Sequence, residues 1–254
     1  MQIIYPKDYL SKGVNEEYRE EAEAMKSNGV HIAMLDQELL KLINVESGTA
    51  VFRGWMFSKK EYAEFYNLCK DSDVSLITSP TEYLNLHHLP NWYESIKDLT
   101  PETVIVKELD DLEFVIKDLD WNSYFIKDFV KSLNTDGGPI ANTFEHIKPM
   151  LEKMEMYRGE IEGGLCIRKV EDFDTSTELR FFVLNGKLLN CVNTPPAIVE
   201  ECAKRISKLS NFFSVDVIKD VNGKDWIVEV GDGQVSGLKE WKVDRFTNEF
   251  SRYL

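Results

Sequence analysis

Residues 212–233, FFSVDVIKDVNGKDWIVEVGDG, carry an Asn-Gly pair between two runs of alternating apolar and polar residues. This pattern is the strongest short-range signal for a β-hairpin, because a two-residue turn needs positive φ at both of its positions. A turn at Asn222 and Gly223 fixes the register of both strands and places Asp216 directly opposite Glu229. The opposite face of the hairpin then carries four valines: Val215 and Val217, and their partners Val230 and Val228.

The opposed acids Asp216 and Glu229 predict a metal site. Like charges directly opposite each other destabilise a strand pair unless something compensates. A divalent cation compensates them, and Mg²⁺ takes one or two carboxylates when phosphates supply other oxygens. Asp232, just past the strand, is a candidate third ligand. The alternative is a solvent-facing sheet surface with two unrelated acids; the apolar Ile218 and Ile227, expected on the same face, favour the metal.

The first hundred residues alternate strand and helix patterns and predict an α/β fold. Strands are expected at 1–6, 30–36, 49–56 and 74–80, and helices at 15–29 and 58–73. Such alternation is typical of a parallel sheet covered by helices. A third helix, 81–98, should be broken at Pro90. His87 and His88 within it are interpreted as a polar helix end and not as a metal-ligand pair.

A boundary is predicted at Thr100-Pro101, beyond which the chain is α+β. Strands are expected at 103–109, 123–131 and 163–173, and helices at 110–120, 143–157, 196–210 and 238–254. Asn185-Gly186 should join two further strands. We therefore expect a domain at 1–99 and a second unit at 100–254.

Basic residues on two of these strands are candidate phosphate ligands. The period of two residues places Lys127 and Lys131 on one face of strand 123–131, between Phe125 and Phe129. A lysine among aromatics needs a negative partner, which a nucleotide phosphate supplies. The alternative is that both lysines run their stems along apolar surface to solvent. Arg180 is a further phosphate candidate, although Glu178 on its own face is an ordinary partner.

The composition narrows the class of partner. The chain has 254 residues, and 44 acidic against 30 basic side chains give a net charge of −14. This balance argues against non-specific binding to nucleic acid or an anionic membrane. The four cysteines include no CxxC pair, and no apolar run approaches the ~20 residues that cross a bilayer. We expect a cytoplasmic protein without disulfides.

Four segments, in order, resemble the ATP-grasp superfamily: YFIKDFVK, GGLCIRKVEDF, ELRFFVLNGKLL, and FFSVDVIKD with WIVEVGDG. The resemblance covers about residues 100–240 and is strongest to amino-acid and peptide ligases related to glutathione synthetase. RGWMFSKKEY and GDGQVSGL are similar to a compact branch found in bacteria and phages. The resemblance implies a Rossmann-like domain (1–99) before a two-lobed ATP-grasp module, with a small lobe at about 100–167 and a large lobe at 168–254.

The resemblance also assigns roles to residues. It implies that Lys127 and Arg180 contact nucleotide phosphates, that Asp216 and Glu229 hold Mg²⁺, and that an acid after the hinge binds ribose. The remaining candidates are the adenine hinge, Arg168, Lys169 and Val170, and the ribose acids, Glu171, Asp172 and Asp174. This chain departs from the family at Arg168, where an acid is usual, and at Gly231, where the usual asparagine is missing and Asp232 is expected to take over.

The predicted function is an ATP- and Mg²⁺-dependent ligase that joins a carboxylate to an amine through an acyl phosphate. The acceptor is expected to be a small molecule, an amino acid or a peptide. Arg53, beside Trp55, is a candidate substrate anchor, and a structural arginine is the alternative reading. Two other functions stay open: a phosphotransferase on the same fold, and a nucleotide-binding or protein-binding module without turnover.

Overall fold

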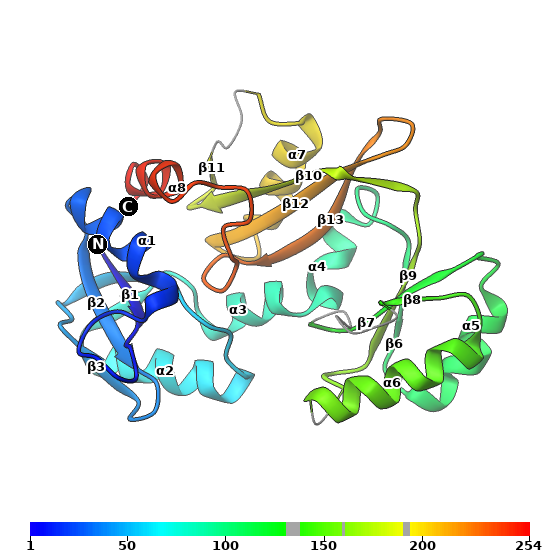
Figure 1. The fold of residues 1–254 in the computed structure, drawn as a ribbon, viewed down its shortest axis with the longest axis horizontal. Coiled ribbons are helices and arrows are strands. Elements are labelled where there is room, and N and C mark those ends of the chain that lie inside the picture. Colours follow the sequence, from blue (N-terminus) through cyan, green and yellow to red (C-terminus); the bar gives the residue numbers. More distant parts are fainter. Residues whose placement is uncertain (131–137, 159–160, 190–193) are drawn as a thin grey trace.

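A computed structural model describes residues 1–130, 138–158, 161–189 and 194–254. These residues form three β-sheets with helices packed against them, a mixed α/β architecture (Figure 1). No helix among them is both long and apolar enough to cross a membrane. Lys131 and most of the loop that follows it lie outside the described residues.

The first sheet has the strand order β3-β2-β1-β4-β5. Strands β1 (Gln2–Pro6), β2 (His31–Asp36), β4 (Gly48–Phe52) and β5 (Val74–Leu76) run parallel, and β3 (Lys41–Ile43), which the sequence did not predict, pairs antiparallel with β2. Helices α1 (Glu16–Ser27) and α2 (Lys59–Asp71) begin at the predicted caps, Asn15 and Ser58. Ser58 forms a capping box with Glu61, which satisfies backbone N–H groups at the helix start.

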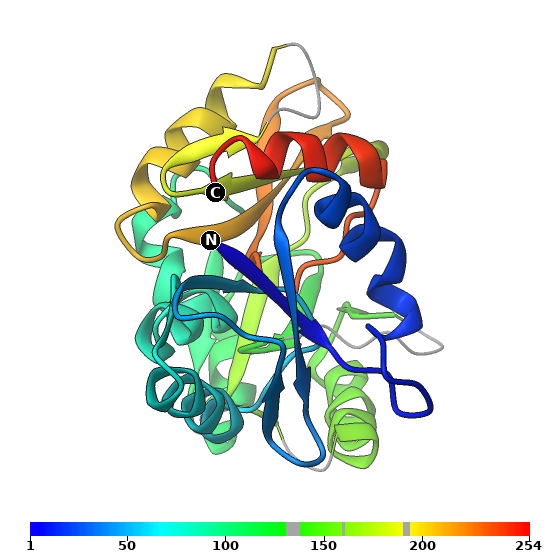
Figure 2. The ribbon, with the colours of Figure 1, turned by 90° about the vertical axis from the view of Figure 1, so that its left-hand side faces the viewer.

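The C-terminal helix completes this part of the molecule. Helix α8 (Val243–Ser251) lies beside α1 (Figure 2), and Phe246 and Phe250 of α8 share a core with Ile3, Tyr5 and Met25. The opposite face of the first sheet packs against α2. One face of the N-terminal sheet is thus buried by the far end of the chain.

Two short helices lead from this sheet to the rest of the chain. Helices α3 (Pro80–His87) and α4 (Leu89–Ile96) replace the single helix of the sequence pattern, and the break falls at His88, two residues before Pro90. Proline is tolerated in the first turn of a helix, where its missing N–H costs nothing, so it starts α4 and does not interrupt it. Trp92, Tyr93 and Ile96 of α4 pack against the C-terminal sheet, although the predicted boundary assigned them to residues 1–99.

The second sheet has the order β6-β9-β7-β8. Its strands are β6 (Thr103–Val106), β7 (Tyr124–Asp128), β8 (Ile140–Ala141) and β9 (Leu165–Lys169), paired antiparallel. A 3₁₀ turn (Leu109–Asp111) precedes α5 (Leu112–Asp118), and α5 and α6 (Phe144–Arg158) share one hydrophobic cluster with the sheet.

The third sheet has the order β11-β10-β12-β13 and is antiparallel. It consists of β10 (Phe173–Leu184), β11 (Lys187–Leu189), β12 (Phe212–Asp220) and β13 (Asp225–Asp232). Val215, Val217 and Val230 on one face pack against α4 and α7 (Ala197–Ile206). The other face carries Asp216 and Glu229.

The hairpin of β12 and β13 reaches the predicted pairing by another route. Its turn is longer than two residues, with Asp220 and Lys224 closing it, so Val217 pairs with Ile227 and not with Val228. A β-bulge at Val228 then shifts the register by one residue, and Asp216 pairs with Glu229 as predicted. Ile227 consequently lies in the core, which corrects its expected place beside the acids.

Candidate active site

A cleft of ≈ 1030 Å³ lies over the acidic face of the third sheet. Its walls come from β7 and β9 of the second sheet, from β10, β12 and β13 of the third, and from the chain after β13. Met56, Leu86 and His87 close the end near the N-terminal sheet. Of the predicted site residues in the described chain, all except Arg53 and Asp174 line this cleft.

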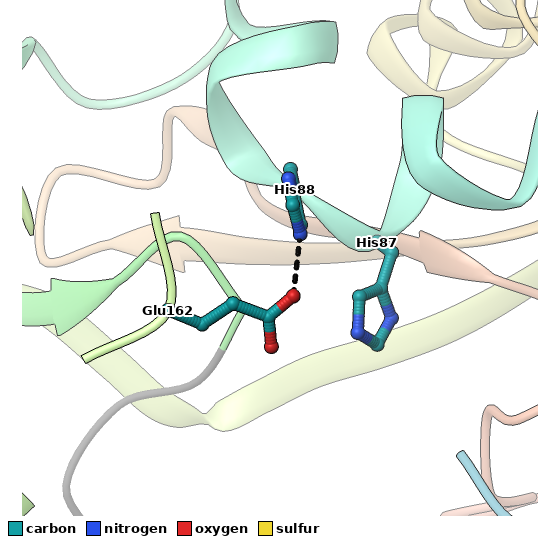
Figure 3. A group of neighbouring side chains, drawn as sticks. All are labelled: His87, His88 and Glu162. Carbon is teal, nitrogen blue, oxygen red and sulfur yellow. Dashed lines mark hydrogen bonds and ion pairs between the residues drawn. The ribbon is translucent and has the colours of Figure 1, made fainter. Parts of the chain in front are cut away.

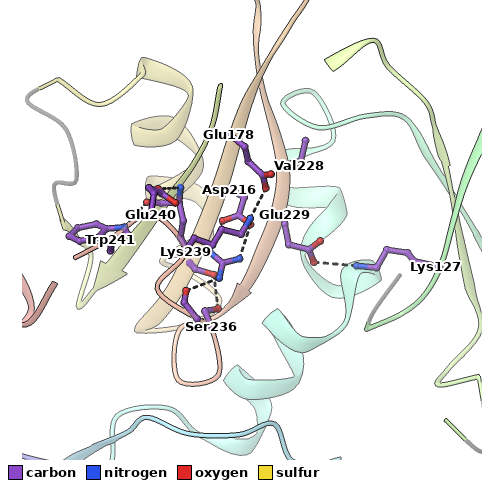
Figure 4. Close-up of polar contacts among 12 residues, drawn as sticks. Lys127, Glu178, Asp216, Val228, Glu229, Ser236, Lys239, Glu240 and Trp241 are labelled. Carbon is purple, nitrogen blue, oxygen red and sulfur yellow. Dashed lines mark hydrogen bonds and ion pairs between the residues drawn. The ribbon is translucent and has the colours of Figure 1, made fainter. Parts of the chain in front are cut away.

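Asp216 lies at the centre of a charged network (Figure 4). Adjacent pairing on β10 and β12 places Arg180 beside it, and Nε and Nη2 of Arg180 donate to Oδ1 and Oδ2 of Asp216, both at 2.7 Å. Lys239 Nζ donates to Oδ2 of Asp216 at 2.8 Å and to Oε1 of Glu178 at 2.6 Å. The Asp216 carboxylate is buried and compensated by two cations.

Lys239 is a site residue that the sequence pattern did not reveal. It sits on the segment after β13, which folds back so that Trp241 Nε1 donates to the Arg180 carbonyl at 2.7 Å and Glu240 accepts from Arg180 N–H. Burial opposes the charge of Lys239, but Asp216 outweighs it and raises the pKa of the ammonium. A lysine in a C-terminal loop carries no local signal for this position.

Glu229 and Lys127 point toward each other from different sheets (Figure 4). Lys127 Nζ donates to Glu229 Oε1 at 3.2 Å. The lysine is 2% exposed, whereas the Glu229 side chain is 41% exposed. The lysine therefore spans from β7 to the acidic face of the third sheet, and the open side of Glu229 faces the cleft.

Asp232 lines the cleft but has a different environment. It pairs with Phe213, and the alternation along β13 gives Gly231 the face of Glu229 and gives Asp232 the face of Val230. Oδ1 accepts from the backbone N–H and the side chain of Gln234, at 2.9 and 3.0 Å, while Oδ2 is buried with no hydrogen-bond partner among the described residues. Burial raises the pKa of Asp232 to about 7.

Arg168 joins the second and third sheets. Its Nη1 donates to the carbonyl of the bulge residue Val228 at 2.7 Å, and its Nη2 and Nε donate to Thr100 and Thr103 at 2.7 and 3.3 Å. It is 6% exposed, and burial lowers its pKa. Its guanidinium thus holds the hinge, which accounts for an arginine where the family usually has an acid.

The residues after Arg168 form one wall of the cleft. Lys169, Val170, Glu171 and Asp172 all line it. The backbone N–H of Lys169 already donates to the Glu102 carbonyl at 2.8 Å. Asp174, the third ribose candidate, instead accepts from Ser176.

Arg53 does not line the cleft, and the structural alternative describes it better than the substrate anchor. It is 2% exposed, and its Nε and Nη2 each donate to the Glu21 carboxylate at 2.9 Å. Its Nη1 donates to the carbonyls of Gly233 and Ser236. The guanidinium lies over the rings of Phe182 and Phe246, at 5.8 and 5.1 Å, and so ties the N-terminal sheet to the segment after β13.

The donor set around the acidic pair suits Mg²⁺. Asp216 and Glu229 offer carboxylate oxygens, the ligands that this hard cation prefers, and each oxygen has a second lone pair beyond its present hydrogen bond. Lys127, Arg180 and Lys239 balance these acids and are placed to contact phosphates. The arrangement can therefore hold a metal–phosphate group between opposed charges.

Comparisons with known proteins identify this arrangement. The family model for the ATP-grasp domain, clade family 3, matches residues 111–250, more than half of the chain. Similar solved structures include the RimK domain protein ATP-grasp from Sphaerobacter thermophilus DSM 20745, with 14% identity and a TM-score of 0.66, covering 100% of this chain and 99% of that chain. D-cycloserine synthetase DcsG has 13% identity and a TM-score of 0.67, with 99% of each chain covered.

A third similar structure is the macrocyclase MdnC bound with precursor peptide MdnA from Microcystis aeruginosa MRC, with 10% identity and a TM-score of 0.63, covering 99% of this chain and 98% of that chain. No curated protein sequence matches the chain. At these identities the structural likeness shows a shared fold, and the family model shows the family. The resemblance seen in the sequence is confirmed: the chain belongs to the ATP-grasp domains, in clade family 3.

Proposed function

We propose that this protein is an ATP- and Mg²⁺-dependent ligase that joins a carboxylate to an amine. The observation that carries the proposal is the cross-strand pair Asp216 and Glu229, which opens into a large cleft between three basic side chains. Opposed acids on a sheet destabilise it unless a cation serves them, so their presence is explained by a bound metal–nucleotide complex.

The nucleotide takes the length of the cleft. Adenine lies at the hinge of Arg168, Lys169 and Val170, and Asp172 is placed to bind ribose, with Glu171 as its neighbour on the same wall. Lys127 and Arg180 contact the phosphates, and Lys131 extends the row of lysines beyond the end of β7. This assignment agrees with the order of the motifs that resemble the family and with the basic lining of the cleft.

Asp216 and Glu229 hold Mg²⁺, with Asp232 a third oxygen ligand if its carboxyl turns into the cleft. Bound Mg²⁺ supplies charge neutralisation for the phosphates. Lys127, Arg180 and Lys239 stabilise the charge that develops on the transferred phosphoryl group. When phosphates occupy the site, Arg180 and Lys239 can share their donors between Asp216 and the nucleotide.

The reaction follows from these positions. A carboxylate oxygen of the substrate attacks the γ-phosphorus of ATP, the bond to the β-phosphate oxygen breaks, and ADP and an acyl phosphate form. A neutral amine then attacks the acyl carbon, phosphate leaves with the bonding electrons, and the amine proton passes to solvent. No side-chain nucleophile is required, so the site needs only binding and electrostatic groups.

The acceptor enters at the end of the cleft near Met56 and Leu86, where the wall is apolar. A small molecule, an amino acid or a peptide fits a ligase of this kind. The names of two proteins with the same fold, a D-cycloserine synthetase and a macrocyclase bound with its precursor peptide, support this range of acceptors. We also propose that residues 1–99 form the Rossmann-like domain that precedes the ATP-grasp module and helps to shape this end.

Product analysis tests the proposal. The protein is incubated with ATP, Mg²⁺ and pools of carboxylates and amines, and ADP release and new masses are recorded. Amide formation that needs both pools is expected, and hydroxylamine in place of the amine should trap the acyl phosphate as a hydroxamate. A stable phosphoester would identify a phosphotransferase instead. ATP binding without turnover on any pool would leave a nucleotide-binding module.

A further inference from the structure

A second group of potential metal ligands lies at one end of the cleft, apart from the acidic pair. His87 ends α3, His88 lies between α3 and α4, and Glu162 precedes β9. One ligand atom from each lies within 4.8 Å of the other two. His88 Nε2 and Glu162 Oε1 are 2.8 Å apart, and the ring of His87 lies beside the same carboxylate (Figure 3).

The backbone that carries these side chains is held in place. Leu89 N–H donates to the Phe129 carbonyl at 2.8 Å, and Phe129 N–H donates to the Glu162 carbonyl at 3.3 Å. Gly163 and Gly164 follow Glu162 with φ of +76° and +127°, and a Cβ on either would collide, with the Phe129 ring or with the Val106 carbonyl. The segments that carry His88 and Glu162 are therefore fixed to the same residue, Phe129.

The orientation of the rings is also defined by packing. The His87 ring stacks on Tyr83, with centroids 4.9 Å apart, and the His88 ring meets Phe129 edge to face at 6.0 Å. Rings held in this way lose little further freedom when they bind a ligand. The cluster is thus partly organised before any ion arrives.

We infer that His87, His88 and Glu162 bind a divalent transition-metal ion, for which Zn²⁺ is the appropriate probe. Two imidazole nitrogens and one carboxylate oxygen form a ligand set that Zn²⁺ accepts at about 2.0–2.2 Å with a fourth position left open. Imidazole ligands favour zinc-like ions over Mg²⁺, which takes oxygen ligands. Rotation of the His87 side chain closes the remaining distance.

The ion would join two parts of the molecule. His87 and His88 belong to the segment that leads out of the N-terminal sheet, and Glu162 belongs to the second sheet, which forms the opposite wall of the cleft. A metal bridge between them fixes the separation of these parts, and His87 itself lines the cleft. The site uses none of the residues proposed to bind ATP or Mg²⁺, so the inference does not depend on the proposed reaction.

Calorimetric titration of the full chain with Zn²⁺, after treatment with a chelator, tests the inference. One tightly bound ion is expected, and Mg²⁺ in about 1,000-fold excess should not displace it, because the ligand set contains two imidazoles. Glu162→Gln and His88→Ala should each weaken binding by at least about 10-fold. His146→Ala, which changes an exposed histidine of α6, is the matched control and should leave the affinity unchanged.

His87→Phe is the decisive variant, because it keeps an aromatic ring against Tyr83 and removes the ring nitrogens. A simple His88–Glu162 ion pair would leave zinc binding weak and insensitive to this change, whereas the three-ligand site predicts a loss of at least about 10-fold. X-ray absorption should show only N/O neighbours near about 2.0–2.1 Å; sulfur at about 2.3 Å would place zinc on cysteine and overturn the inference. Unchanged zinc binding in Glu229→Gln separates this site from the ATP site.

Discussion

Asp216 and Glu229 are direct partners across β12 and β13, although their neighbours Val217 and Val228 are not. The bulge at Val228 makes this possible, since it restores at the acids a register that the turn had shifted by one residue. Arg168 Nη1 donates to the carbonyl of that same bulge residue at 2.7 Å. The geometry of the acidic pair is therefore linked to the hinge between the second and third sheets.

Lys127 should be a main determinant of nucleotide affinity. Lys127→Met removes the cation that approaches Glu229 from β7, and we expect the affinity for ATP with Mg²⁺ to fall about 10- to 100-fold, since hydrogen bonds to charged groups contribute about 1.5–3 kcal/mol. Isothermal titration calorimetry measures this directly. The loss of stability should be small, because Glu229 is partly exposed and can be solvated.

Lys219→Met is the matched control for that variant. Lys219 lies on β12 and pairs with Asp225, and both side chains are partly exposed. Its removal changes the net charge by the same amount outside the cleft. Equal ATP affinity in wild type and Lys127→Met, or equal losses in both variants, would contradict the assignment of Lys127 to the phosphates.

Arg53 should act through stability. Burial alone lowers the pKa of its guanidinium, but the Glu21 carboxylate outweighs burial and raises it. Glu21→Gln leaves this buried cation without its counter-charge, which we expect to cost about 3–5 kcal/mol of unfolding free energy. Arg53→Met in the same chain should recover part of that loss. Urea denaturation of both single variants and the double variant measures the coupling.

The exposed pair of Lys60 and Glu64 on α2 provides the comparison. Glu64→Gln should change the unfolding free energy by no more than about 0.5 kcal/mol. If Glu21→Gln costs no more than this control, or if Arg53→Lys selectively weakens substrate binding in a fully stable protein, the structural role given to Arg53 is wrong.

Asp232 should make the stability depend on pH. Its folded pKa of about 7 lies above the ordinary value of 3.8. The stabilisation linked to the proton is therefore complete below pH ~4 and is lost as pH rises through ~7. Between about pH 5 and about pH 8 this amounts to about 2.5 kcal/mol. The unfolding free energy of wild type should fall over this range relative to Asp232→Asn; parallel pH profiles would refute the prediction.

The same carboxyl tests whether Asp232 is a metal ligand. A ligand must be ionised, so binding of ATP with Mg²⁺ near pH ~7 should release a proton if Asp232 joins the metal. The binding enthalpy would then vary with the ionisation enthalpy of the buffer, and this dependence should disappear in Asp232→Asn. No difference between the two proteins would exclude Asp232 from the metal shell.

The fold and the acidic pair were largely accessible from the sequence because they depend on local patterns. The Asn185-Gly186 turn has positive φ at both residues, as the pattern requires, and Ser58 caps α2 through neighbours three residues away. At the second hairpin only Gly223 has positive φ, so the predicted two-residue turn was wrong. The pair of acids was still found because the bulge offset that error.

The remaining site residues depend on contacts between distant segments. Lys239 reaches Asp216 only because the chain after β13 folds back over β10, and Arg168 bridges Thr100 and Val228, which are far apart in the sequence. Arg53 could not be assigned from its neighbour Trp55, because its partners are Glu21 and the segment after β13. Local periodicity carries no information on such contacts.

Nucleotide-dependent thermal stabilisation tests the central claim most directly. Wild type and Glu229→Gln are compared with ATP plus Mg²⁺ and with ATP plus EDTA, and Glu178→Gln, which changes a second acid of the cleft outside the opposed pair, is the control. Ligands that bind the native state raise the melting temperature by mass action. We predict a Mg²⁺-dependent rise in wild type and in Glu178→Gln that Glu229→Gln abolishes. No rise with any nucleotide in wild type, or an undiminished rise in Glu229→Gln, would contradict the account.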